Sequence, residues 1–246
     1  MKIYDMKIYD EFADWFHLLT HPDDYVGEAA DYVRMIQATC PGARTLLELG
    51  SGGGNNAFHM KRAFICTLTD VSPRMLDLSQ SINPECEHVV GDMRTLRLGR
   101  LFDVVFVHDA VEYMTTIADL SQAAATAFTH TRPGGIALFV SDGTKETFKE
   151  SVDDGGHDGP DGRALRYLEW TIDPDPSDNR YEVHFACLLR NGATVHAVHD
   201  RHEHALFTRR QWLDVLGAAG FVVSTPPLDE ATHELQVAFL ARRMER

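Results

Sequence analysis

Three strand-like segments, each followed by glycine or an acidic residue, constrain the fold of this chain most strongly. The apolar run 46–49 leads into a glycine-rich turn at 50–54, Asp70 ends a second run, and Gly91 and Asp92 end a third. In an open α/β sheet, ligands bind outside the carboxyl ends of the strands. The repetition therefore predicts an α/β fold with one cleft suited to a nucleoside.

The spacing of the glycines indicates which nucleotide class the cleft binds. A dinucleotide fingerprint reads Gly-x-Gly-x-x-Gly, and its third glycine lets the next helix pack closely. Here glycines stand at 50, 52 and 54, and Asn55 occupies the place of that third glycine. Asp70 can accept ribose hydroxyls in either class, whereas Asp92 suits the exocyclic amine of an adenine and Met93 suits its ring. The pattern favours an adenosyl ligand over a dinucleotide.

Five segments together resemble the class I S-adenosylmethionine-dependent methyltransferases in order and spacing. They are Glu48-x-Gly50-x-Gly52-x-Gly54, Asp70, Gly91-Asp92-Met93, the run 102–107 and Arg132-Pro133-Gly134-Gly135. The match spans residues 43–142 and implies a Rossmann-like seven-stranded methyltransferase sheet with S-adenosylmethionine as cofactor. The layout of residues 9–32 and 207–242 is also similar to the amino-sugar N-methyltransferases of antibiotic pathways.

The resemblance implies a set of cofactor-binding residues. They are Tyr25, Glu48, Gly50, Ser51, Gly52, Gly54, Asp70, Val71, Met75, Asp92, Met93 and His108. Tyr9 and Tyr25 stand at positions that look like the aromatic-lid and cofactor-carboxylate contacts of the amino-sugar enzymes. Aromatic rings closing over a sulfonium would gain cation–π attraction. The alternative is that the aromatic segment around Tyr9 is an amphipathic flap that only packs on the core.

Candidate catalytic residues follow the fourth predicted strand. Methyl transfer depends on alignment and exclusion of water, because positioning alone supplies large effective molarities, so a dedicated base is not required. His108 has an ordinary pKa near ~6.5 and is a candidate base, whereas Asp109 or Glu112 could hold an ammonium. We take His108, Glu112 and Tyr9 as the candidate catalytic set. The alternative is that His108 offers only its backbone and that Glu112 caps the next turn.

Helix signals occur at four places. Apolar residues at helical spacing predict a helix over 24–39. Ser72–Pro73 predicts a helix that begins near residue 73. The patterns at Thr116–Asp119 and Thr208–Gln211 resemble capping boxes and predict helices that begin near residues 117 and 209. These helices alternate with the predicted strands, as an α/β sheet requires.

Between residues 144 and 206 this alternation stops. Residues 181–190 alternate in polarity, Asn191-Gly192 indicates a type I′ hairpin, and 165–172 supply an earlier strand. We expect an antiparallel β cap of at least three strands, inserted after the fifth core strand and covering the acceptor site. The loop 153–162, with four glycines, is expected to be mobile.

Length and charge limit the classes of protein that this chain can be. At 246 residues and 44% hydrophobic, it can bury one sizeable core with an insertion. The expected units are an N-terminal lid and helix (1–40), an α/β core (41–143 plus 207–246) and the cap (144–206). A formal charge of −14 argues against nucleic acid, since affinity for it comes largely from Lys and Arg, and against anionic membranes.

The expected location is the cytoplasm. No apolar run reaches the ~20 residues of a transmembrane helix, and the N-terminus offers no signal-peptide core. The cysteines at 40, 66, 86 and 187 are far apart in sequence, which is typical of reduced, buried thiols.

Two features of the cap have competing interpretations. Strand alternation places His196, Asp200, His202 and His204 on one face, where three or four such ligands could hold zinc. We prefer a chance cluster on a polar cap strand and assign no metal. Glu169 and Trp170 also alternate, so one of the two should face the pocket.

The predicted function is transfer of a methyl group from S-adenosylmethionine to an amine or hydroxyl of a small natural-product or sugar-like metabolite. The small-molecule acceptor is the predicted partner, nucleic acid and membranes are not, and a homodimer is compatible with the sequence. One alternative is an NAD-dependent oxidoreductase, which Asn55 and the Gly91-Asp92 turn disfavour. Another is a protein that binds S-adenosylmethionine without turnover. The acceptor, the atom methylated and the need for a base stay open.

Overall fold

A seven-stranded sheet forms the core of the computed structural model, which describes residues 7–228 and 236–245. Its strands are β1 (Thr45–Leu49), β2 (Ile65–Asp70), β3 (Glu87–Val90), β4 (Phe102–Val107), β5 (Thr131–Ser141), β10 (Val222–Ser224) and β11 (Val237–Arg242). They lie in the order β10-β11-β5-β4-β1-β2-β3. Strands β1 to β5 run parallel, and β11 is antiparallel to both β5 and β10. The predicted Rossmann-like sheet is confirmed.

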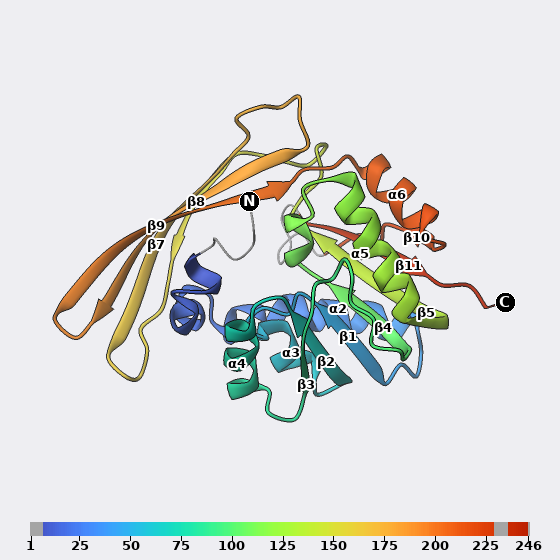
Figure 1. Cartoon of the computed structure of the whole chain (residues 1–246), viewed down its shortest axis with the longest axis horizontal. Coiled ribbons are helices and arrows are strands. Elements are labelled where there is room, and N and C mark those ends of the chain that lie inside the picture. The colour runs from blue at the N-terminus through green and yellow to red at the C-terminus, as the bar shows by residue number, and fades with distance from the viewer. Residues whose placement is uncertain (1–6, 229–235, 246) are drawn as a thin grey trace.

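Helices cover both faces of this sheet (Figure 1). The helices α5 (Ile117–His130) and α6 (Arg209–Ala218) share a buried cluster with strand residues such as Leu47 and Phe139. On the other face, α2 (Val26–Thr39) and α3 (Asn55–Met60) share a cluster with Leu46 and Leu138. Successive strand residues therefore enter two different cores, as expected for a largely parallel sheet buried on both sides.

The predicted helix starts are confirmed by their caps. Helix α4 (Pro73–Ile82) begins after Ser72, whose hydroxyl accepts a hydrogen bond from the Met75 amide. Thr116 caps α5 by accepting from the amide of residue 119, and Thr208 forms a reciprocal capping box with Gln211 at the start of α6. Within α2, the buried stripe runs through Ala29, Tyr32 and Ile36, whereas the apolar residues Val26 and Ala30 are exposed.

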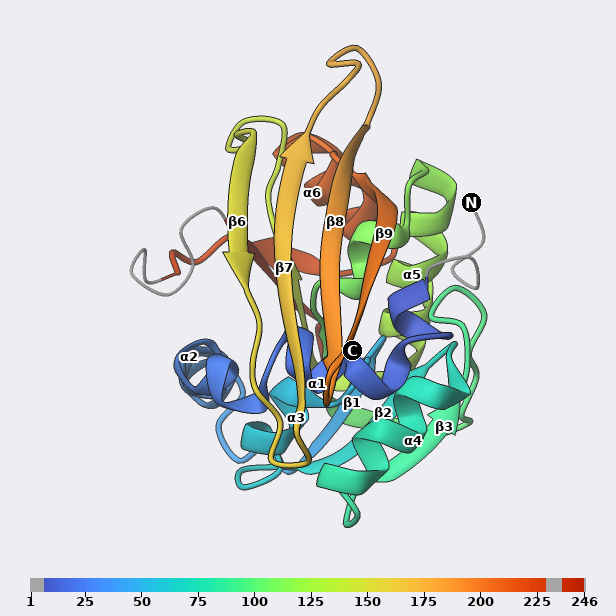
Figure 2. The same ribbon diagram turned by 90° about the vertical axis from the view of Figure 1, so that its left-hand side faces the viewer.

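The cap is a second, antiparallel sheet of four strands inserted between β5 and α6. Its strands are β6 (Ser151–Gly155), β7 (Arg163–Ile172), β8 (Arg180–Asn191) and β9 (Thr194–Ala205), in that order across the sheet. Figure 2 shows these strands standing side by side in front of the core. The prediction of an antiparallel cap after the fifth core strand is confirmed.

Two local predictions in the cap were wrong. Residues 153–155, expected to lie in a loop, belong to β6 and pair with β7. The β8–β9 hairpin exists, but Asn191 pairs with Thr194, so the two-residue loop is Gly192-Ala193. Only Gly192 of these has a positive φ, at 58°, which fits a type II′ turn.

Short helical segments at the N-terminus lie between the core and the cap. They are η2 (Lys7–Tyr9), η3 (Ala13–Trp15), α1 (Phe16–Leu19) and η4 (Pro22–Tyr25). The Ser72 hydroxyl on the core donates to the Tyr9 carbonyl at 2.8 Å, and the Ile8 amide donates to Asp200 on β9 at 3.1 Å. Leu18 packs in a cluster with Leu165 and Leu189 of the cap. The lid is therefore fastened to both sheets.

Among residues 7–228 and 236–245, no helix combines the length and the apolar character needed to cross a membrane. The cysteines are free and buried, as predicted.

Candidate active site

A cavity of about 460 Å³ lies at the carboxyl ends of the core strands, between the lid and the cap. Its core wall comprises Glu48, Gly50, Ser51, Gly52, Gly53, Asn55, Asn56, Asp70, Val71, Gly91, Asp92, Met93, His108, Asp109, Ala110, Tyr113, Met114, Asp142 and Gly143. Its lid wall comprises Tyr9, Phe16, Leu19, Thr20 and Tyr25, and the segment 148–204 supplies Phe148, Lys149, Ser151, Tyr167, Glu169, Thr171, Tyr181, Val183, Phe185 and His204. The predicted cleft is therefore present, and three separate parts of the chain build it.

The glycine-rich turn forms the floor of this cavity. Gly50 has a φ of 78°, and a Cβ there would overlap the Ala110 side chain, so only glycine fits. Asp70 holds the turn in place because its Oδ2 accepts from the Gly52 amide at 2.9 Å and its Oδ1 accepts from the Ser72 amide at 2.8 Å. This loop brings backbone amides and one carboxylate to the same edge of the sheet.

Two predicted cofactor residues do not reach the cavity wall. Gly54 has a φ of 79°, and a Cβ there would overlap Ser79 and Asn83 of the α4 segment. Met75 is 1% exposed and lies under the turn, its Cε 3.8 Å from where a Gly52 Cβ would stand. Both residues therefore support the turn from behind. The sequence could not show this, because close helix packing and ligand contact require the same small or apolar residues.

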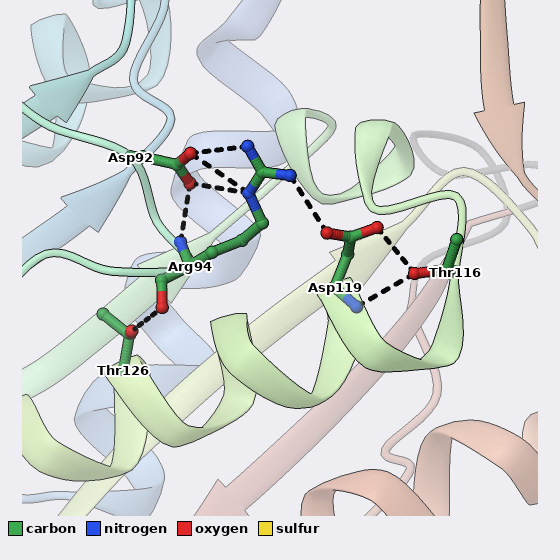
Figure 3. A network of polar contacts seen from close by, with 5 residues as sticks. All are labelled: Asp92, Arg94, Thr116, Asp119 and Thr126. Carbon is green, nitrogen blue, oxygen red and sulfur yellow. Dashed lines mark hydrogen bonds and ion pairs between the residues drawn. The ribbon is translucent and has the colours of Figure 1, made fainter. Parts of the chain in front are cut away.

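Asp92 is held by a network that was not foreseen from the sequence (Figure 3). Its carboxylate accepts from the Arg94 amide at 2.8 Å and from Arg94 Nε at 3.0 and 3.1 Å. Arg94 Nη1 also donates to Asp119, whose carboxylate accepts from the Thr116 hydroxyl. Burial raises the pKa of Asp92, but Arg94 outweighs it and leaves that pKa below its usual value. The carboxylate is thus ionised and oriented towards the cavity edge.

Several buried polar atoms on the wall lack a protein partner. Within the described residues, Glu48 Oε2, Ser51 Oγ and Asn55 Oδ1 make no hydrogen bond. Glu48 is 3% exposed, and its burial raises the pKa of the carboxyl to about 8. Unpaired buried polar groups cost free energy, so their concentration here fits a site that a polar ligand completes. The hydroxyl and amino groups of S-adenosylmethionine match acceptors of this kind.

His108 lies on the wall as predicted, but its environment differs from the one expected for a base. Its Nδ1 is 3.0 Å from Asp109 Oδ1, and its Nε2 is 3.0 Å from the Tyr32 hydroxyl and 3.7 Å from Glu28 Oε1. Burial lowers the pKa of His108, but the charges of Asp109 and Glu28 outweigh it and raise that pKa to about 10. At neutral pH the ring is an imidazolium, so it cannot accept a further proton.

The residues next to His108 complete an acidic corner. Asp109 adopts φ 30° and ψ −54°, a strained conformation of the kind found at functional sites. Burial and the charge of Asp109 raise the pKa of Asp142 to about 8. Glu112 is not on the wall: it is 1% exposed, and its Oε1 accepts from the Asp142 amide at 3.1 Å. The expectation that Glu112 holds the acceptor is therefore corrected, because η5 (Ala110–Tyr113) turns its side chain inwards.

The cavity wall also contains residues that sequence reasoning missed. Tyr113 follows Glu112, and Tyr181 and His204 come from facing positions of β8 and β9. The question of Glu169 and Trp170 is answered, because Glu169 lines the cavity and Trp170 is 55% exposed on the outer face. Strand alternation was the only available signal, and it could not say which face is inside.

The histidines of β9 differ in burial and in whether they line the cavity. His202 is 2% exposed, His204 lines the wall and His196 is exposed. Throughout the part of the chain that the structure describes, no group of three His, Cys, Asp or Glu side chains has an arrangement that could hold a metal ion.

Comparison with known proteins identifies the family. A family model described as "Methyltransferase domain" matches residues 46–135. The chain is 30% identical over 217 residues to dTDP-3-amino-3,4,6-trideoxy-alpha-D-glucopyranose N,N-dimethyltransferase of Streptomyces venezuelae, covering 87% of this chain and 91% of that protein. It is 26% identical over 219 residues to dTDP-3-amino-3,6-dideoxy-alpha-D-glucopyranose N,N-dimethyltransferase of Streptomyces fradiae, covering 83% and 80%.

Similarity of fold supports the same family. The crystal structure of Streptomyces venezuelae DesVI superposes with a TM-score of 0.82 at 25% identity and covers 96% of this chain and 98% of that one. These matches set aside the oxidoreductase alternative. This chain therefore belongs to the class I S-adenosylmethionine-dependent methyltransferases.

Proposed function

We propose that this enzyme methylates the amino group of a sugar-like small molecule, with nucleotide-linked amino sugars as the first acceptor class. The observation that carries the proposal is the acidic corner of the cavity, where Asp109, Asp142 and Glu169 face the acceptor space. Burial raises the pKa of Asp109, but His108 outweighs it and leaves that pKa below its usual value, so Asp109 supplies a negative charge that attracts an ammonium and disfavours a neutral hydroxyl by comparison. The two curated relatives named above carry 3-amino sugars in their names, which supports the same class.

The proposed cofactor contacts divide between backbone and side chain. Gly50, Ser51 and Gly52 would receive the methionine end, and Asp70 would accept the ribose hydroxyls. Asp92 and Met93 would flank the adenine, while Tyr25 and His108 border the reactive end. Val71 and Glu48 complete the wall, whereas Gly54 and Met75 act by holding the turn.

When bound, the sulfonium supplies a methyl group that the acceptor nitrogen attacks in line. The chain's part is to align that nitrogen, exclude water and balance charge. His108, as an imidazolium, holds the strained Asp109 carboxylate in place at 3.0 Å. We therefore propose a positioning role for His108 instead of the role of base, with Tyr9 closing the lid over the reacting atoms.

Recognition of a nucleotide would need a cation. Of the described residues on the cavity wall, Lys149 is the one with a Lys or Arg side chain, and it is exposed. A diphosphate would therefore lie near this rim with the amino sugar inside. Lys149→Ala should raise KM for a nucleotide-linked amino sugar about tenfold and leave KM for the free amino sugar unchanged.

A transfer assay with methyl-labelled S-adenosylmethionine tests the function. The acceptors are a nucleotide-linked 3-amino sugar, the free amino sugar and the matching 3-hydroxy sugar. Label on the two amines and not on the hydroxy sugar is the expected result. Label only on the hydroxyl would overturn N-methylation, and intact donor binding without label on any acceptor would favour the binding protein that lacks turnover.

The assembly of the enzyme is also a proposal. The outer face of the cap exposes Val152 (64%), Trp170 (55%), Leu188 (52%) and Val195 (55%), which strand pairing places on one side. We propose a homodimer through this face, and Trp170→Glu should convert it to a monomer in light scattering.

We also propose a cytoplasmic location, which suits the free thiols, and three functional units: lid (1–40), core (41–143 plus 207–246) and cap (144–206).

A further inference from the structure

Two carboxyl groups meet on the cavity wall at the ends of neighbouring strands. Asp109 stands two residues after β4 and Asp142 directly follows β5, and these strands are adjacent and parallel. Both residues line the cavity, and a hydrogen bond joins their side chains. Ionised carboxylates can only accept hydrogen bonds, so a bond between two of them requires one proton. Asp109 and Asp142 therefore form a carboxyl pair that shares a proton.

The contacts of this carboxyl pair place the proton on Asp142. Asp109 Oδ1 lies 3.0 Å from Nδ1 of the His108 imidazolium. Asp142 Oδ1 instead accepts from the neutral amide of Gln236 at 3.3 Å. Burial raises the pKa of Asp109, but His108 outweighs it and leaves that pKa below its usual value, whereas burial and the charge of Asp109 raise the pKa of Asp142. At neutral pH these contacts leave Asp109 ionised and Asp142 protonated.

Other charged and titratable groups surround the carboxyl pair and enter its pH dependence. They are His108 after β4, Glu112 and Tyr113 on η5, Glu28 and Tyr32 on α2, Tyr9 and Tyr25 in the lid, Glu48 on β1, Tyr181 on β8 and His204 on β9. Burial raises the pKa values of these tyrosines, and burial and the charge of His202 lower the pKa of His204 to about 3, so they are uncharged at neutral pH. His108 supplies positive charge beside the pair, and Asp109 and Glu28 already engage it.

A cation that enters the cavity would change the balance within the carboxyl pair. A nearby positive charge favours the ionised form of a carboxyl group and lowers its pKa. The proposed donor placement brings the sulfonium to His108, and Asp109 follows His108 directly in the chain. The sulfur of S-adenosylhomocysteine, the demethylated donor, carries no charge. The carboxyl pair can therefore distinguish the charged donor from its neutral product.

We propose that Asp109 and Asp142 hold one proton until the donor's sulfonium enters, release it to solvent, and then accept the proton of the acceptor ammonium. The inference rests on the proposed N-methylation and deepens it by assigning the base. In the acceptor step, an N–H bond of the ammonium breaks, its electrons stay on nitrogen, and an O–H bond forms on the carboxyl pair. The neutral nitrogen then attacks the methyl group, so a C–N bond forms while the electrons of the C–S bond remain on sulfur. The carboxyl pair thus regains its proton as the positive charge moves from sulfur to nitrogen.

Calorimetry of donor binding without an acceptor tests the proton release. Titrations of the full-length enzyme in buffers of different ionisation enthalpy count the protons released. At pH 7, S-adenosylmethionine should release about one proton more than S-adenosylhomocysteine, and we call this difference the excess release. The affinity for S-adenosylmethionine should rise about tenfold from pH 6 to pH 7 and level off above about 8, where Asp142 is already ionised. The affinity for S-adenosylhomocysteine should change by about twofold at most.

Two substitutions on the cavity wall identify the proton source. Asp142→Asn keeps an oxygen that can accept from Gln236 but removes the titratable group, so the excess release should disappear. Glu48→Gln is the matched control, because burial raises the pKa of this second wall carboxyl to about 8 as well. It should retain the excess release. Excess release that survives in Asp142→Asn, or that is lost in Glu48→Gln, would overturn the carboxyl pair as the source.

Infrared difference spectroscopy tests the same point on the unaltered enzyme, so it does not depend on whether a variant folds. Exchanging S-adenosylhomocysteine for S-adenosylmethionine should remove the C=O band of a protonated carboxyl and add a carboxylate band. Labelling with ¹³C-aspartate should shift both bands, which separates Asp142 from Glu48. Loss of an imidazolium band with the carboxyl band unchanged would overturn the proposal, because His108 would then be the proton source.

Turnover with a primary amino sugar tests the second half of the proposal. Asp142→Asn should lower kcat at least about a hundredfold at neutral pH, in the range of general base catalysis. The deficit should shrink as the pH rises past the pKa of the acceptor, because the amine then arrives without its proton, whereas a structural defect would persist at every pH. Wild-type kcat in Asp142→Asn would overturn the carboxyl pair as the base. Excess release without methylation of any amine would instead contradict the proposed function alone.

Discussion

The proposed donor half and the proposed acceptor half of the cavity are built by different means. On the donor side, Gly50, Gly52 and Asp70 act through a backbone turn between adjacent parallel strands. On the acceptor side, Tyr9, Tyr113, Glu169, Tyr181 and His204 bring side chains from the lid, η5 and three cap strands.

The comparison shows why the two halves tolerate change differently. At Gly50 an added Cβ would overlap the Cβ of Ala110, and no change of rotamer moves either Cβ, so the turn permits only glycine. Side chains that meet across separate elements can be exchanged singly without disturbing the fold. Donor binding should therefore be sensitive to small backbone changes, and acceptor choice should respond to individual side chains of the cap.

The largest effect is expected at the donor turn. Gly50→Ala forces a Cβ against Ala110 at a φ of 78°, so S-adenosylmethionine affinity should fall more than a hundredfold, or about 3 kcal/mol. Gly192→Ala in the cap hairpin, at a φ of 58° with open space around it, is the matched control and should retain donor affinity. Calorimetry decides, and equal losses in both variants would break the distinction between the halves.

The next effect concerns the acid that holds the turn. Asp70→Ala removes acceptors for the Gly52 and Ser72 amides as well as the proposed ribose contact. Loss of hydrogen bonds to a charged group costs ~1.5 to 3 kcal/mol, so donor affinity should fall roughly ten- to a hundredfold. Calorimetry at fixed pH measures it, and unchanged affinity would contradict the assigned cleft.

A pH effect on stability is expected from Glu48. Burial raises the pKa of its carboxyl from 4.5 to about 8 in the folded state. The stability from the protonated form is therefore complete below pH 4.5 and is lost as the pH rises through about 8. In urea unfolding without ligand, the wild type should lose on the order of 2 kcal/mol relative to Glu48→Gln between pH 5 and 9. Parallel pH curves for both proteins would show that Glu48 ionises normally.

The smallest effect should come from the acceptor wall. Glu169→Gln removes one of the proposed ammonium contacts from β7 and should raise KM for an amino sugar roughly threefold to tenfold, because a partly solvated charge contributes about 1 kcal/mol. Donor affinity should stay the same. Steady-state kinetics and calorimetry together test this, and a parallel loss of donor affinity would show that the two halves are not separable.

The sequence by itself determined the core fold and the residues that stand at the carboxyl ends of its strands. Gly50, Asp70 and Asp92 stand at or just after the ends of strands at regular spacing. Local geometry requires each of them, so their positions could be predicted from the order of residues alone. The caps at residues 72, 116 and 208 were equally local, because each cap binds an amide only three residues away. Gly54 and Met75 were predicted to contact the cofactor but do not reach the cavity wall, because close packing and ligand contact select similar residues.

Only the tertiary structure decided which side chains meet. His108 is an imidazolium because Glu28 and Asp109, from distant and adjacent positions, share its buried site. Tyr113 bonds to His202 across 89 residues, and Glu169 faces the cavity while Trp170 faces outwards. Alternation along a strand defines two faces but not which is inside, and charges act through space over distances that linear order does not report. The electrostatics of the acceptor half therefore arise only when lid, core and cap come together.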